Sequence, residues 1–113
     1  MIEPTITLQS EDLPTAHLMR IKGNLDVTNS HAIEKEFMTW IESANRKLVI
    51  DLNGVAFMSS AGLRVILNGF KLAGEKGIGI ALFGLNPAVE RVFDIVGLHQ
   101  LFSLHKDLDS AIA

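Results

Sequence analysis

The first quarter of the chain alternates between polar and apolar residues in two short runs. These runs are TITLQ at 5–9 and HLMRIKG at 17–23, and the turn-like stretch SEDLPT lies between them. Alternation with a period of two is typical of strands that bury one face, and two such runs joined by a turn predict a hairpin. We therefore expect an antiparallel pair of strands at one edge of a sheet.

Downstream of residue 29, helical and strand-like patterns follow one another. Apolar residues recur at helical spacing near 30–45, 60–74 and 87–97, with continuous apolar runs at 47–52 and 78–84 between them. A last short strand is predicted at 101–105 and a terminal helical turn or two at 106–113. The order β-β-α-β-α-β-α-β-α implies an α/β fold: a mixed, largely parallel sheet with helices packed on it.

Residue types that begin and end helices agree with these segments. Asn29 or Ser30 can cap the first helix, and Gly74 or Gly77 can end the second. The third has an asparagine cap, a proline at its first position and a glycine stop, at Asn86, Pro87 and Gly97.

Composition narrows the class of protein. A chain of 113 residues with 48% hydrophobic residues predicts a single globular domain over 1–113. Its net charge of −3 and scattered basic residues give no stripe for nucleic acid phosphates. The chain lacks cysteine, a signal peptide pattern and any apolar run near the roughly 20 residues that span a bilayer. We expect a cytoplasmic protein with no nucleic acid partner and no membrane insertion.

Two adjacent serines are the main candidate for chemistry, because they lie between a buried strand and an apolar helix. Either Ser59 or Ser60 can cap the helix, at a value of about 1 kcal/mol. Because a helix N-terminus favours negative charge, the same position also suits a phosphorylated serine. A third possibility is a nucleophile at Ser60, with Asp94 and then His99 or His105 in hydrolase order. Met58 stands where the nucleophile motif has its first glycine, and the chain is short for such an enzyme.

The remaining candidates carry little chemistry. The four histidines share no metal-ligand spacing, so no metal site is predicted. The glycines of GEKGIGIALFG do not form a phosphate-binding fingerprint, because Leu82 replaces the last glycine and a strand follows instead of a helix. No cofactor is therefore expected.

Three stretches together resemble the STAS domain of the anti-sigma factor antagonist family. They are GNLDVTNSHAIE at 23–34, VIDLNGVAFMSSAGLRVIL at 49–67 and NPAVERVFDIVGLHQLF at 86–102. They follow the family's order and span most of the chain. The resemblance implies the STAS fold and a regulator, not an enzyme. Its unphosphorylated form would bind an anti-sigma factor that is also a serine kinase, thereby releasing a sigma factor.

By the same resemblance, the kinase would phosphorylate the serine two residues before the glycine, which is Ser60, and a serine phosphatase would reverse the reaction. The family often has aspartate immediately before that serine, where this chain has Ser59, so Ser59 is the second candidate for modification. Ala61 also replaces a common serine. Two alternatives stay open: a STAS subunit of a lipid-transport or sensory complex that is not phosphorylated, and a small serine hydrolase.

We expect the partner to contact residues from the starts of the first and second helices. The predicted docking face consists of Asp26, Val27, Thr28, Asn29, Met58, Ser59, Ser60, Gly62 and Arg64. The edge hairpin allows a monomer or a weak dimer.

Overall fold

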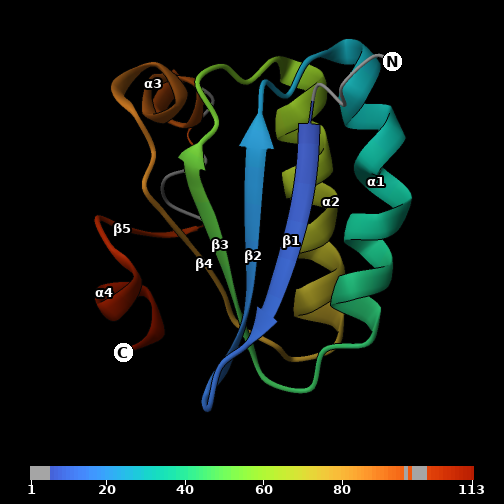
Figure 1. Ribbon diagram of the computed structural model, residues 1–113, viewed down its shortest axis with the longest axis vertical. Helices are drawn as coiled ribbons and strands as arrows, with labels where there is room; N and C mark the ends of the chain where they lie inside the picture. Colours follow the sequence, from blue (N-terminus) through green and yellow to red (C-terminus); the bar gives the residue numbers. More distant parts are fainter. Residues whose placement is uncertain (1–5, 96, 98–101) are drawn as a thin grey trace.

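The computed structural model describes residues 6–95, 97 and 102–113, and in this part of the chain five strands form one mixed sheet (Figure 1). Their spatial order is β1-β2-β3-β4-β5. β1 pairs antiparallel with β2, whereas β2, β3, β4 and β5 are parallel neighbours. Their bounds are β1 Ile6–Asp12, β2 Ala16–Gly23, β3 Lys47–Gly54, β4 Ile80–Phe83 and β5 Ser103–His105. The predicted edge hairpin and element order are confirmed.

Helices cover both faces of this sheet. α1 and α2 lie side by side on one face, and α4 lies against the other (Figure 1). Their bounds are α1 Val27–Glu42, α2 Ser60–Glu75, α3 Pro87–Ile95 and α4 Leu108–Ile112. The larger apolar cluster joins α1, α2 and α3 to the sheet, and a smaller one places Ala111 of α4 against Leu18 and Val49. The first half of β2, at Ala16 and Leu18, is therefore buried on both faces, whereas its alternation predicted one buried face.

α1 begins three residues earlier than the sequence predicted. Its N-cap is Asp26, whose carboxylate accepts hydrogen bonds from the amides of Thr28 and Asn29, both at 2.9 Å. The Asn29 side chain accepts in return from the Asp26 amide at 2.8 Å, which completes a capping box. The expectation of an Asn29 or Ser30 cap was wrong, because this reciprocal pair fixes the helix start at Val27.

The ends of the other helices agree better with the sequence. Asn86 caps α3, as expected, and accepts a hydrogen bond from the Val89 amide at 2.8 Å. Gly77, with φ of +71°, follows α2, whereas Gly74 lies inside that helix. Gly97 also has a positive φ, two residues beyond α3.

The C-terminal end of α1 is capped by a lysine from the end of α2. The Lys76 ammonium donates hydrogen bonds to the carbonyls of Ile41 at 3.1 Å, Ala44 at 2.9 Å and Glu42. The Ile41 and Glu42 carbonyls belong to the last turn of α1, where carbonyls have no intrahelical donor and carry partial negative charge. One side chain therefore joins the far ends of the two helices.

We expect Lys76→Met to lower the free energy of unfolding by about 1–2 kcal/mol, because it removes three charge-assisted hydrogen bonds. Urea denaturation monitored by circular dichroism measures the change. Lys71→Met, at an exposed position on the same helix, is the matched control and should stay within about 0.5 kcal/mol of the native protein. Equal midpoints for the two variants would contradict this role of Lys76.

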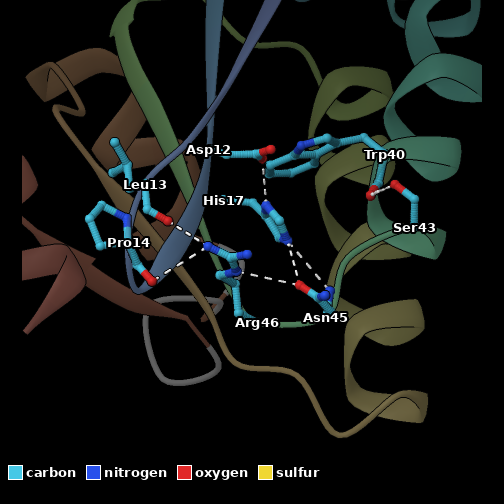
Figure 2. Close-up of polar contacts among 8 residues, drawn as sticks. All are labelled: Asp12, Leu13, Pro14, His17, Trp40, Ser43, Asn45 and Arg46. Carbon is cyan, nitrogen blue, oxygen red and sulfur yellow. Dashed lines mark hydrogen bonds and ion pairs between the residues drawn. The ribbon is translucent and has the colours of Figure 1, made fainter.

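A second polar cluster lies where β2 and β3 begin (Figure 2). The His17 imidazole is hydrogen bonded through Nδ1 to Asp12 Oδ1 at 2.8 Å and through Nε2 to Asn45 Oδ1 at 3.0 Å. Arg46 donates to the Leu13 carbonyl at 2.7 Å. These bonds tie the β1–β2 turn to the loop between α1 and β3. Because Ser59 and Ser60 follow the carboxyl end of β3, this cluster lies at the opposite edge of the sheet from the serines.

Candidate functional site

The starts of α1 and α2 are held next to each other by backbone hydrogen bonds. The Leu25 amide donates to the Phe57 carbonyl at 3.0 Å, and the Ser59 amide donates to the Leu25 carbonyl at 2.8 Å. The result is a parallel bridge between Leu25 and Met58. Both segments follow parallel strands, so their carboxyl ends share one edge of the sheet, where function collects in α/β folds. The structure therefore brings the two predicted halves of the docking face together.

The two serines have different roles at this edge. Ser59 is the N-cap of α2, and its Oγ accepts a hydrogen bond from the Gly62 amide at 3.2 Å. Ser60 is the first helical residue and is exposed. The sequence left the cap open between them, and the structure assigns it to Ser59. Ser60 thus presents a hydroxyl at the helix start, next to amides that have no intrahelical acceptor.

Capping by Ser59 changes the stability expected of the serine variants. Ser59→Ala should lower the free energy of unfolding by about 1 kcal/mol, because the Gly62 amide loses its acceptor. Ser60→Ala should change it by less than about 0.5 kcal/mol, because Ser60, which the sequence also allowed as the cap, does not cap the helix. Thermal unfolding of the two variants beside the native protein measures both values. A larger loss for Ser60→Ala would reverse the assignment of the cap.

The residues of the predicted docking face differ in exposure. Val27 is 72% exposed, Thr28, Ser60 and Arg64 are also exposed, and Asp26 and Ser59 are half-buried. The side chains of Asn29 and Met58 are only 4% and 2% exposed, and Gly62 is buried against Leu25. These three residues therefore lie beneath the surface and do not present side chains to a partner. Their expected place on the docking face is corrected in this respect. Phe57, which the predicted docking face did not include, is 52% exposed beside Met58; its only signal in the sequence is an aromatic residue in a loop.

A groove of about 340 Å³ runs between α1 and α2 at this edge. Ser60 lines it together with seven other residues: Val27, Ser30, His31, Glu34, Ala61, Arg64 and Val65. Among the described residues, Ser30 Oγ is a buried side-chain atom with no hydrogen-bond partner, and Ser30 is only 1% exposed. In the sequence, Ser30 was a candidate only for a helix cap, and His31 was only one of four histidines without metal-ligand spacing, because nothing in the pattern indicates which face of α1 meets α2.

The hydrolase constellation is not assembled within the described part of the chain. His105 lines a separate hollow with Asn53 and Asn86, and its Nε2 is hydrogen bonded to Ser103 Oγ at 2.5 Å. His99 lies outside the described residues. Within the residues that the structure describes, no three histidine, aspartate or glutamate side chains gather closely enough to hold a metal ion.

Comparison with known proteins agrees with this geometry. The family model of the STAS domain matches residues 7–111. The anti-sigma F factor antagonist of Paenibacillus polymyxa is 30% identical over 96 residues, which cover 84% of this chain and 82% of that protein. The chain is a STAS domain protein of the anti-sigma factor antagonist family. The family predicted from the three sequence stretches is thus confirmed.

Solved structures share the fold of this STAS domain. The anti-sigma factor antagonist from Mycobacterium paratuberculosis superposes with a TM-score of 0.85 at 28% identity, covering 94% of this chain and 90% of that one. The Bacillus cell fate determinant SpoIIAA in its phosphorylated form superposes with a TM-score of 0.69 at 20% identity, covering 92% and 96%. None of the helices described in this STAS domain is long and apolar enough to cross a bilayer.

Proposed function

We propose that this protein is an anti-sigma factor antagonist controlled by phosphorylation of Ser60. Its unphosphorylated form binds, in the cytoplasm, an anti-sigma factor that is also a serine kinase, and the bound sigma factor is released. The observation that carries the proposal is the exposed Ser60 hydroxyl at the start of α2, in the groove that the exposed Val27 and Arg64 also line. A relative of the same fold has a phosphorylated form, which supports the same chemistry here.

The switch consists of one phosphoryl transfer and its reversal. A bond forms between Ser60 Oγ and the γ-phosphorus of ATP, the bond from that phosphorus to the bridging oxygen breaks, and ADP leaves. The serine proton goes to a base on the kinase. A serine phosphatase restores the hydroxyl by transferring the phosphoryl group to water. The domain accommodates the new dianion because the helix start favours negative charge.

The proposal is tested by the site of phosphorylation. The full chain is incubated with ATP and each candidate anti-sigma kinase of its source organism, then intact mass and peptide mapping are measured. One added phosphate at Ser60, absent in Ser60→Ala, is expected. Ser59→Ala is the matched control and should still be modified. Phosphate mapping to Ser59 alone would contradict the assignment of Ser60 while keeping the regulatory class.

A protein that folds but accepts no phosphate from any kinase would favour the second function, a permanently active STAS subunit in a lipid-transport or sensory complex. Turnover of an ester that Ser60→Ala abolishes would favour a hydrolase instead. The exposed side of β1, which forms the sheet edge in Figure 1, leaves a monomer or weak dimer as the expected state.

A further inference from the structure

The groove between α1 and α2 contains three groups suited to a phosphate, and two of them lie across from Ser60. Arg64 is exposed one helical turn after Ser60, and residues four apart on a helix are neighbours on one face. Ser30 and His31 line the facing side from α1. In the described part of the chain, no ion pair engages the Arg64 guanidinium.

We propose that this groove is an internal receptor for the phosphate on Ser60, with Arg64 as its principal cation and Ser30 and His31 as donors from α1. This inference rests on the proposed phosphorylation of Ser60. The guanidinium fork matches phosphate oxygens in pairs, which makes arginine the side chain best suited to this contact.

The buried Ser30 hydroxyl is the independent observation that points to a ligand. A hydroxyl buried without a partner is costly and rare in folded proteins, so an unpartnered one at a groove indicates an acceptor that is missing. A phosphate oxygen supplies such an acceptor. The amides at the start of α2 add further donors, because the Ser59 side chain accepts from the Gly62 amide and leaves the amides before it without an intrahelical acceptor.

One acidic residue also lines the groove, but its carboxylate is engaged away from Ser60. Glu34 Oε2 accepts a hydrogen bond at 3.1 Å from Asn68, which lies one turn beyond Arg64 on α2. Glu34 itself is one turn beyond Ser30 on α1. The groove is therefore divided along its length, with the hydrogen-bond donors and the Arg64 cation near Ser60 and the carboxylate farther in.

This arrangement changes what phosphorylation does to the docking surface. Arg64 is exposed in the unphosphorylated chain and is the one lysine or arginine of the predicted docking face. Once the phosphate binds it, the cation is withdrawn from any partner. Phosphorylation thus adds a charge and removes an existing contact in a single step.

The test measures the phosphate itself, without a kinase or partner. Phosphoserine is incorporated at position 60 of the full chain during synthesis, and its ³¹P resonance is followed against pH. We expect the titration midpoint of the native sequence to lie roughly 0.3 pH unit or more below that of Arg64→Gln. The difference should shrink in 1 M salt, because the pair is at the surface. Arg91→Gln, at an exposed position on α3, is the matched control and should titrate like the native sequence.

Two further variants distinguish specific contacts between the groove and the phosphate from a general electrostatic effect of nearby charges. Ser30→Ala and His31→Gln should each raise the midpoint while leaving the unphosphorylated chain folded. Equal midpoints for the native sequence, Arg64→Gln and Arg91→Gln would overturn the receptor. If the phosphate still abolished partner binding in that case, the proposed function would stand without it. A displaced midpoint in a chain that no kinase modifies would support the receptor and contradict the proposed function.

Discussion

Phosphorylated Ser60 is expected to weaken binding of the anti-sigma factor by at least roughly 100-fold. A dianion at the start of α2 must lose its water when a partner covers the exposed Val27, Thr28 and Ser60. Burial of such a charge without a new cation costs several kcal/mol, and each 1.4 kcal/mol is a factor of ten in affinity. The effect needs no change in the fold, because Ser60 is exposed and takes no part in capping α2.

Isothermal titration calorimetry with the purified anti-sigma factor measures this loss. Ser60→Ala should bind like the unphosphorylated native protein and should not respond to the kinase. Ser60→Asp carries a single charge and should bind more weakly than Ser60→Ala, though less weakly than the phosphorylated chain. Ser10→Asp places the same charge at an exposed position on β1 and should bind normally. If Ser60→Asp and Ser10→Asp bound equally well, the electrostatic account of the switch would be wrong.

The element order could be predicted because, along most of the chain, the spacing of hydrophobic residues and the length of each segment indicate the same type of element. The start of α1 could not, because the stretch LDVTNS offers four residues that can cap a helix. The choice depends on the reciprocal hydrogen bonds between Asp26 and Asn29, which only the backbone geometry reveals. The burial of Leu18 also could not be predicted. The alternating polar and apolar residues of β2 indicate one solvent-exposed face, but α4 packs against Leu18 on that face.

The positions of the site's serines in the sequence could be predicted, but the residues that lie next to them in space could not. The strand-serine-serine-helix pattern located Ser59 and Ser60, yet both serines suit a cap, and a shift of one residue turns a side chain by about 100° around the helix. The groove could not be predicted from the sequence, because Ser30 and His31 are separated from Arg64 by more than 30 residues. What brings them together is the close packing of α1 on α2, which depends on two glycines.

These glycines should be the most sensitive positions of α2. A Cβ added at Gly62 would lie 2.6 Å from Leu25 Cβ and 2.9 Å from the Leu25 carbonyl oxygen. A Cβ at Gly69 would lie 2.5 Å from Phe37 Cε2 and 2.8 Å from Ile41 Cδ1. We expect Gly62→Ala to lower the free energy of unfolding by about 2–3 kcal/mol, because the crowded atoms belong to the bridged backbone and its first side-chain carbon. Gly69→Ala should cost about 1–2 kcal/mol, since ring and methyl groups can shift.

Gly74 provides the control on the same helix. Nothing lies within 4 Å of a Cβ placed there, so Gly74→Ala should raise the free energy of unfolding by about 0.5–1 kcal/mol through helix propensity alone. Urea denaturation of the three variants and the native protein measures these differences. We expect the stability to rise in the order Gly62→Ala, Gly69→Ala, native and Gly74→Ala. A stabilising Gly62→Ala would contradict the close approach of the helix starts. Because Leu25 positions α1 beside Ser59, the Gly62 variant should also weaken binding of the anti-sigma factor more than Gly69→Ala does, even under conditions in which both are folded.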